Sequence, residues 1–192
     1  MKLIDIQIRG IQPLLMHRFT EAAETASSSK ARKVKLDLGT PREQAERAAN
    51  KNPDGTFYIS AFAIPNAMGA AGANYKMPGT RKSMRFIVPS AIRIFEPIIT
   101  VMNGAGPAMD FEVDSRPVTI PSTKGRIMRH RPRFDCWGLE FTIGVDDSLM
   151  EISDAQMLLE QAGLSIGLGD FRPEKRGPFG TFRVTKFEER KE

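Results

Sequence analysis

The chain has 192 residues, of which 41% are hydrophobic and 27% charged, and this predicts one folded globular domain over 1–192. Its first residues alternate apolar and polar side chains without a long apolar run, which indicates neither a signal peptide nor a membrane anchor. The single cysteine, Cys136, excludes an internal disulfide framework and suits a reducing compartment, so we expect a cytoplasmic protein.

Positive charge is concentrated in two segments, 76–93 and 115–134, and neither contains an acidic residue. Together they carry eleven cations against a formal net charge of +5, so the rest of the chain is net negative. Such clustering is typical of surfaces that bind phosphate, with a solvated basic face that aids solubility as the alternative. The cations are Lys76, Arg81, Lys82, Arg85 and Arg93 in the first segment, and Arg116, Lys124, Arg126, Arg129, Arg131 and Arg133 in the second.

Six stretches have a clear period and are expected to form the core. Alternation with period two predicts strands, and apolar residues three or four apart predict helices. In chain order they are a strand at 3–9, a helix at 61–75, strands at 91–101 and 137–145, a helix at 153–163 and a strand at 180–187. This β-α-β-β-α-β order is that of the ferredoxin-like (RRM-like) arrangement, so the sequence predicts an α+β fold of this class.

Local signals refine the helix limits and add two short elements. Thr40 precedes a proline and has an acid three residues later, which predicts a short helix near 41–50. Pro65 is tolerated only near a first helical turn, so the next helix should begin between 61 and 64. The apolar residues 86–88 predict a short strand.

Two long insertions separate the expected core elements. Residues 19–55 contain few large apolar side chains, so we expect a flexible or finger-like insertion whose central part, 20–52, orders on contact with a ligand. Residues 102–134 form a basic insertion between the second and third core strands. Long irregular insertions in a compact domain are often functional, and these two hold much of the positive charge.

Residues 164–180 form a glycine-rich loop that leads into the last strand. Glycine has no Cβ, so such a loop can present bare N–H groups to an anion while neighbouring cations add charge. The alternative is a long connection whose glycines only serve turn geometry. The residues concerned are Gly167, Gly169, Gly177 and Gly180, with the cations Arg172, Lys175 and Arg176.

The second basic segment adds a candidate row of phosphate contacts. Arg129, Arg131 and Arg133 alternate, so in a strand they would project to one side. Arg126 and His130 accompany them, and we count both among the candidate nucleic-acid contacts together with Lys76, Arg81, Lys82 and Arg85. Phe134 and Trp137 could stack a base or belong to the core. We expect both cation segments and the glycine loop to converge on one side of the domain.

Three motifs together resemble the repeat-associated mysterious protein (RAMP) superfamily of CRISPR systems. They are the Gly-x-Gly…Gly-x-Phe-Gly pattern of 167–180, residues 57–71 before and within the first expected helix, and residues 8–15 at the first strand and its exit. The middle motif departs from the family pattern, because Ser60 stands where proline is common and Pro65-Asn66 replace a polar-lysine pair. The chain looks similar to the small backbone subunits that coat guide RNA, or to a compact phage or mobile-element relative.

The resemblance implies binding of single-stranded RNA, or of single-stranded DNA, by copies that stack head to tail along the strand. Phosphate contacts would then supply most of the affinity and make it steeply dependent on salt. Some RAMP relatives are metal-independent endoribonucleases that use a histidine, which leaves His130 and His17 as candidate catalytic residues in an alternative reading. A third reading assigns the basic segments to protein contacts in a scaffold.

Signals for other chemistry are missing from the sequence. Two histidines and one cysteine make no pattern with metal-ligand spacing, and no P-loop, nucleophile elbow or dinucleotide fingerprint occurs. We therefore expect no cofactor and no metal.

Overall fold

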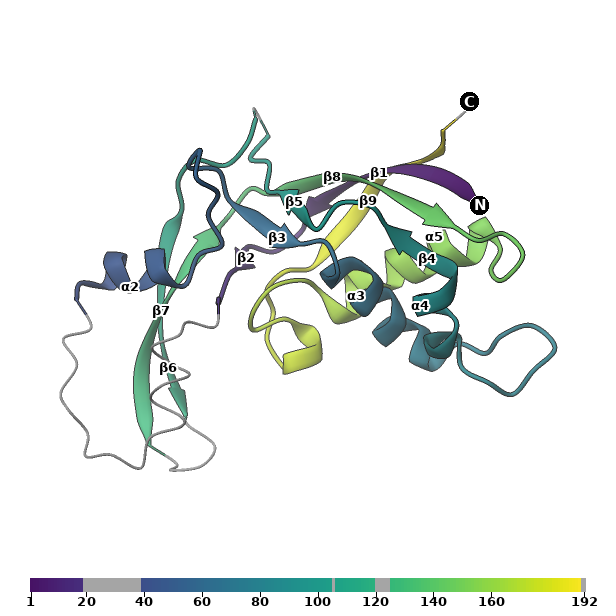
Figure 1. Ribbon diagram of the computed structural model, residues 1–192. Coiled ribbons are helices and arrows are strands. Elements are labelled where there is room, and N and C mark those ends of the chain that lie inside the picture. Colours follow the sequence, from purple (N-terminus) through teal and green to yellow (C-terminus); the bar gives the residue numbers. More distant parts are fainter. Residues whose placement is uncertain (19–38, 105, 120–124, 191–192) are drawn as a thin grey trace, which may run out of the picture.

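The computed structural model describes residues 1–18, 39–104, 106–119 and 125–190. Its centre is a four-stranded antiparallel sheet in the order β4-β8-β1-β9. These strands are β4 (Ile92–Ile94), β8 (Gly138–Val145), β1 (Lys2–Gly10) and β9 (Phe182–Glu189). Helices α3 (Ala63–Ala71) and α5 (Ile152–Gln161) lie on one face of this sheet (Figure 1). The chain is thus a mixed α/β protein with antiparallel sheets.

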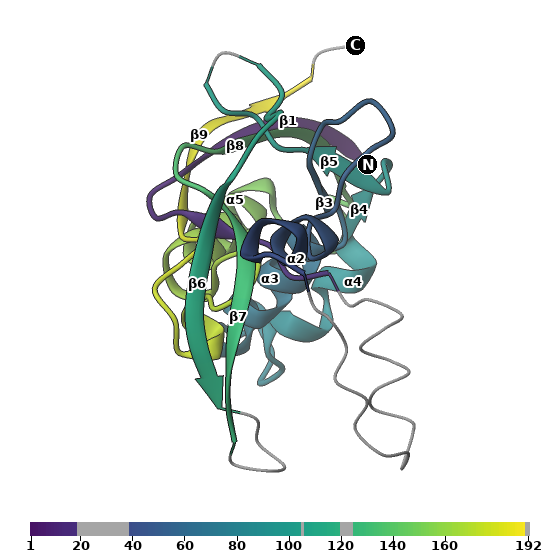
Figure 2. The same ribbon diagram turned by 90° about the vertical axis from the view of Figure 1, so that its left-hand side faces the viewer.

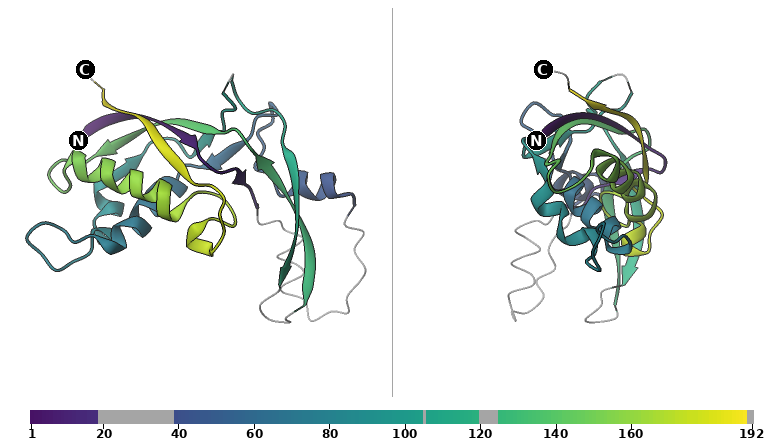
Figure 3. Two further views of the ribbon diagram at one scale, coloured as in Figure 1. Left: turned by 180° about the vertical axis from the view of Figure 1, so that it is seen from behind. Right: turned by 90° about the vertical axis from the view of Figure 1, so that its right-hand side faces the viewer.

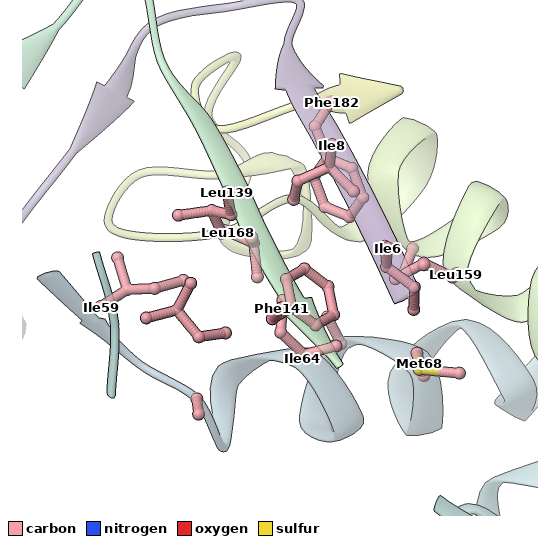
Figure 4. Close-up of a cluster of buried hydrophobic side chains, with 14 of the residues drawn as sticks. Ile6, Ile8, Ile59, Ile64, Met68, Leu139, Phe141, Leu159, Leu168 and Phe182 are labelled. Atoms are coloured by element: carbon pink, nitrogen blue, oxygen red, sulfur yellow. The ribbon is translucent and has the colours of Figure 1, made fainter. Parts of the chain in front are cut away.

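The strands and helices of this layer pack through their alternating apolar residues. On β1, Ile4, Ile6 and Ile8 are at most 2% exposed. All three belong to one core cluster with Met68 of α3 and Leu159 of α5, and Figure 4 shows Ile6 and Ile8 in it. Full burial of each such side chain contributes about 1.5–3 kcal/mol relative to exposure. The period-two alternation of the sequence therefore fixes which face of the sheet receives the helices.

Most predicted core elements are confirmed, and two expectations are wrong. The strand expected at 91–101 is two separate strands, because Pro97 interrupts it. The second of these, β5 (Ile98–Thr100), leaves the central sheet and pairs with β3 (Tyr58–Ser60). The apolar stretch at 86–88 is helical rather than extended, where the 3-10 helix η2 (Met84–Phe86) is followed by α4 (Val88–Ala91).

A long β-hairpin extends away from the central sheet (Figures 1 and 2). It consists of β6 (Glu112–Thr119) and β7 (Arg126–Phe134), and the short β2 (Leu14–Leu15) pairs with the base of β7. Residues 135–137 join β7 directly to β8, and Trp137 within this connection is 4% exposed. The connection is held by the Trp137 indole N–H, which donates to the Gln12 carbonyl at 2.8 Å. The hairpin is therefore directly continuous with β8, an interior strand of the central sheet.

Helix α2 (Pro41–Arg47) packs against β7 near the hairpin base (Figure 2). The Thr40 side chain and Glu43 form the predicted capping box at its start. Arg42 donates to the Phe111 carbonyl at 2.7 Å and lies over the Phe111 ring. Of the insertion expected at 19–55, residues 19–38 lie outside the described part of the chain, whereas 39–55 carry this helix and a turn.

Four short helical segments complete the described structure. The 3-10 helix η1 (Gly72–Asn74) extends α3, and the π-helical turn η3 (Ala162–Ile166) extends α5. The 3-10 helix η4 (Pro173–Lys175) lies inside the glycine-rich loop, and η2 closes the loop that carries the first basic segment. Helix α3 begins at Ala63, as the position of Pro65 predicts.

Candidate nucleic-acid interface

One face of the β6–β7 hairpin carries charged side chains at alternate positions. The register places Arg129 opposite Arg116, Arg131 opposite Asp114 and Arg133 opposite Glu112. Directly opposite residues of an antiparallel pair project to the same face. The prediction that Arg129, Arg131 and Arg133 share one side is therefore confirmed.

This face is joined to the glycine-rich loop by two contacts. Arg131 Nε lies 2.8 Å from Asp170 Oδ2, and the Arg116 guanidinium lies 4.6 Å from the centre of the Phe179 ring. Arg116 is held in turn by Asp114, whose two carboxylate oxygens accept from its Nε at 2.8 and 3.0 Å. We call this region the hairpin–loop junction, made of His17, Arg116, Arg129, Arg131, Asp170 and Phe179.

Arg131 is buried in the junction rather than exposed to a ligand. Its side chain is 7% exposed, and its Nε forms an ion pair with Asp170 without the alignment of a hydrogen bond. Burial lowers the pKa of Arg131 and the Asp170 charge opposes that effect, but an arginine stays charged. The expectation that Arg131 is an accessible phosphate contact is therefore wrong, because its charge is committed to holding the loop on the hairpin.

The remaining arginines of the expected row differ in their partners. Arg133 is paired with Asp135, two residues further along the chain. Arg129 is half-buried and donates to Nε2 of His17, a neutral partner, so its positive charge is not cancelled there. Arg126, nearer the hairpin tip, is exposed. Of the expected row of three, only Arg129 therefore has no acidic partner among the described residues. Arg126 lies nearer the tip and on the opposite face of the hairpin.

The two histidines lie in different places. His17 follows β2 and belongs to the junction, where partial desolvation and then the charge of Arg129 lower its pKa. Asp170 acts in the opposite direction, and Arg131 adds to the lowering. His130 lies on the other face of the hairpin, where its Nδ1 is 2.7 Å from the Ser115 hydroxyl. The histidine beside the cations is therefore His17, not the His130 that the sequence favours.

The glycine-rich loop is packed and hydrogen-bonded. The N–H groups of Gly167, Gly177 and Gly180 donate to the carbonyls of Ala162, Arg172 and Pro13. The expectation that these glycines present bare N–H groups to an anion is therefore wrong.

The backbone conformation and close packing at two of these positions explain why glycine is present there. Gly169 has φ +75, and a Cβ there would lie 2.3 Å from the Leu15 carbonyl oxygen. Gly180 has φ +71, and its Cβ would meet the Leu168 carbonyl at 1.8 Å. L-residues with side chains rarely adopt such φ values. The glycines therefore let the loop press against β2 and against itself.

The loop cations are not equivalent. Arg172 donates to the Gly169 carbonyl at 2.7 Å and pairs with Glu174, so it holds the loop together. Lys175 and Arg176 are exposed, and no ion pair of either is found within the described residues. A polyanion could reach these two side chains on the loop and Arg129 on the junction face of the hairpin, whereas Arg126 is exposed on the opposite face.

The first basic segment lies far from the junction. Lys76, Arg81, Lys82 and Arg85 belong to a loop and to η2, which extend from the end of α3 opposite the hairpin (Figures 1 and 3). The expectation that both cation segments converge on one side is therefore wrong. Phe134 and Trp137 are each 4% exposed and belong to the core, so neither can stack a base.

The sequence reasoning missed Asp170 and gave Arg116 no role in the site. Asp114, with a side chain 5% exposed, was also overlooked as the partner of Arg116. Alternation along 112–119 could have placed Asp114 and Arg116 on the same strand face. No local signal links Asp170 to a strand almost forty residues earlier.

Within the described ranges, no three His, Cys, Asp or Glu residues are grouped so as to hold a metal ion. In the same part of the chain, every helix is too short or too polar to cross a membrane. No model of a protein family matches this sequence, and a comparison with curated proteins gives no match.

Proposed function

We propose that the protein is a non-catalytic single-stranded nucleic-acid-binding protein of the RAMP type. RNA is the preferred ligand and single-stranded DNA the second, and copies assemble along the strand in the cytoplasm. The observation that carries the proposal is the hairpin–loop junction. There the Arg131–Asp170 pair joins the hairpin to the glycine-rich loop, and each of these two segments carries exposed cations.

The strand order supports the RAMP assignment. The sheet order β4-β8-β1-β9 with antiparallel neighbours, and with α3 and α5 on one face, is the order expected of a ferredoxin-like core. The elements inserted into this core, α2 and the β6–β7 hairpin, are those that bear or border the junction. This agrees with the sequence resemblance, which covers the core and leaves the insertions unmatched.

Charge decides how the strand would bind. Arg129 in the junction, and Lys175 and Arg176 on the loop, form no ion pair within the described residues. Each phosphate neutralised on a single strand contributes about −0.7 to the slope of log K against log salt. The strand would therefore bind mainly through its backbone and tolerate many base sequences.

A polarisation titration tests the proposal. Labelled single-stranded RNA and DNA are titrated with the protein at low and at physiological salt, and the variants Arg129→Ser and Lys175→Ser are compared with wild type. We expect tight binding at low salt and a shallower salt slope in each variant. Arg183→Ser, which removes an exposed cation from β9, is the matched control and should bind as wild type does. Absence of binding by wild type at low salt would end the proposal.

Assembly needs its own measurement. Light scattering on nuclease-treated protein, with and without a long single strand, separates the two readings of the basic segments. An increase in particle size that depends on added nucleic acid supports assembly on nucleic acid. An increase in particle size without nucleic acid supports the scaffold reading, in which the basic segments contact protein.

A second candidate function is metal-independent RNA cleavage, and one observation favours it. The lowered pKa of His17 keeps its imidazole neutral near pH 7, beside the Arg129 guanidinium that could hold a phosphate. When the Arg129 guanidinium leaves His17 Nε2 to hold that phosphate, Nε2 can accept a proton from a ribose 2′-hydroxyl. Incubation with RNA in chelator should then give discrete products that vanish in His17→Ala and persist in His130→Ala, with no cleavage of DNA.

A further inference from the structure

The segment of residues 76–86, which we call the basic tip, has a well-fixed backbone. The Ser83 hydroxyl donates to the Gly72 carbonyl at 2.7 Å and accepts from the Arg85 N–H at 3.2 Å. Two further backbone bonds, from Met84 to Tyr75 at 2.8 Å and from Met77 to Lys82 at 2.9 Å, tie the two sides of the loop together. The tip is therefore anchored to the end of α3.

Phe86 is the most exposed large hydrophobic side chain among the described residues, at 73%. It lies between Met84, which is 6% exposed, and Val88, which is fully buried, so its neighbours hold the turn while its ring faces solvent. A single exposed phenylalanine is common on protein surfaces and carries no argument alone. What surrounds the ring is therefore decisive.

The loop that leads into Phe86 is cationic. Lys76, Arg81, Lys82 and Arg85 are all exposed, and the described residues provide no ion pair for any of them. The sequence has no acidic residue from 55 to 95. Proteins bind single-stranded nucleic acids by combining an accessible aromatic ring with unpaired cations, because bases stack on the ring and phosphates contact the cations.

We propose that the basic tip is a second contact for the strand, in which Phe86 stacks on a base and the four cations hold the neighbouring phosphates. This inference rests on the proposed function for the class of ligand. The junction offers no comparable ring, since Phe179 is 5% exposed and Phe171 is half-buried against it. The two regions therefore have different tasks, because the junction binds phosphates alone and the tip binds a base together with its neighbouring phosphates.

An anionic membrane is the other surface that combines cations with an aromatic ring. Surface binding of this kind usually requires an amphipathic helix whose apolar face lies in the interface. The tip is a loop closed by the three-residue helix η2, with one exposed ring. A single strand is therefore the better match, and vesicle binding becomes an outcome of the test.

The ring is tested with Phe86→Leu, which keeps an apolar side chain and removes the stacking surface. Polarisation titrations use labelled oligouridylate and a strand of the same length that lacks bases. We expect about a tenfold loss of affinity for oligouridylate and no loss for the abasic strand. Phe95→Leu, at an aromatic position that is 57% exposed on another part of the surface, is the control and should match wild type on both strands.

The cations are tested with the double variant Arg81→Ser, Lys82→Ser. Loss of two phosphate contacts should make the slope of log K against log salt shallower by about 1.4. The control is the double variant Arg93→Ser, Arg183→Ser, which removes the same charge from exposed strand positions. All exchanged side chains are exposed, and circular dichroism checks that each variant is folded.

The outcomes separate this inference from the proposed function. If Arg129→Ser weakens binding while the tip variants bind as wild type, the basic tip is not a contact and the proposed function stands. If wild type binds neither strand, both fall. An equal loss on the oligouridylate and abasic strands in Phe86→Leu overturns stacking. Binding to phosphatidylserine vesicles that requires Phe86, with no effect of Phe86 on strand binding, overturns the choice of ligand.

Discussion

Asp170→Asn isolates the charge that joins the glycine-rich loop to the hairpin. The Asp170 carboxylate pairs with Arg131 through Oδ2 and accepts from the Phe171 N–H through Oδ1 at 2.9 Å. Asparagine keeps an oxygen for the Phe171 bond and has nearly the same volume. The substitution therefore removes the charge and little else.

The size of the effect follows from the burial of Arg131. Unit charges 2.8 Å apart attract by about 6 kcal/mol at an effective dielectric constant of about 20. Desolvation of a buried ion costs several kcal/mol, so the intact pair is close to balance. Asparagine removes the attraction and leaves the desolvation penalty of Arg131.

The expected loss is about 2–3 kcal/mol, at or just below the roughly 3–5 kcal/mol that breaking a fully buried pair costs. The loss is not larger for two reasons. Asp170 is 29% exposed, and the carboxylate of Asp114, opposite Arg131 on the neighbouring strand β6, still compensates part of the Arg131 charge. In a domain of this size such a loss lowers Tm by about 5–10 °C.

Urea unfolding followed by circular dichroism measures this difference, with Asp170→Asn and Arg131→Met each compared with wild type. The double variant Arg131→Met, Asp170→Asn should recover to within about 1 kcal/mol of wild type, because the buried charge is then gone as well. If Asp170→Asn unfolds within about 0.5 kcal/mol of wild type, the pair does not hold the loop and the reasoning fails.

Two further predictions concern the loop and the histidine. Gly169→Ala should cost more than about 3 kcal/mol, since strain at positive φ adds to a Cβ that would lie 2.3 Å from the Leu15 carbonyl oxygen. Gly79→Ala, at φ +69 with no atom within 4 Å, should cost only about 1–2 kcal/mol in the same urea experiment, and equal losses would contradict this account. The pKa of His17 lies below its ordinary value of 6.5, so as pH falls below 6.5 the unfolded state takes up the proton first and stability decreases until the folded pKa is passed. His17→Gln should flatten the stability profile in this range, and an unchanged profile would show that His17 is not the group responsible.

Much of the core could be predicted because its signals are local. Alternation in β1 and β8 reflects burial on one side of a strand, and the position of Pro65 sets the start of α3. The helical turn at 86–88 could not be predicted in the same way. Three apolar residues in a row fit a strand or a buried turn equally well, and tertiary packing of Val88 decided between them.

The junction shows why a site is harder to predict than a strand. Period-two spacing correctly placed Arg129, Arg131 and Arg133 on one face. Which of them stays accessible depends on Asp170, a residue from a distant loop that buries Arg131. The glycine content of that loop predicts an anion-binding loop, whereas the close contacts of these glycines, and the positive φ of Gly167, Gly169 and Gly180, show that they serve packing.

The connection at 135–137 between β7 and β8 has a mechanical consequence. Strand β8 is flanked by β4 on one side and by β1 on the other, so both of its edges are hydrogen-bonded. A sideways force on the protruding hairpin would therefore be resisted as shear across two ladders, instead of peeling away an edge strand one bond at a time. The hairpin can therefore bear a load from a molecule in contact with it while β8 stays paired with β4 and β1.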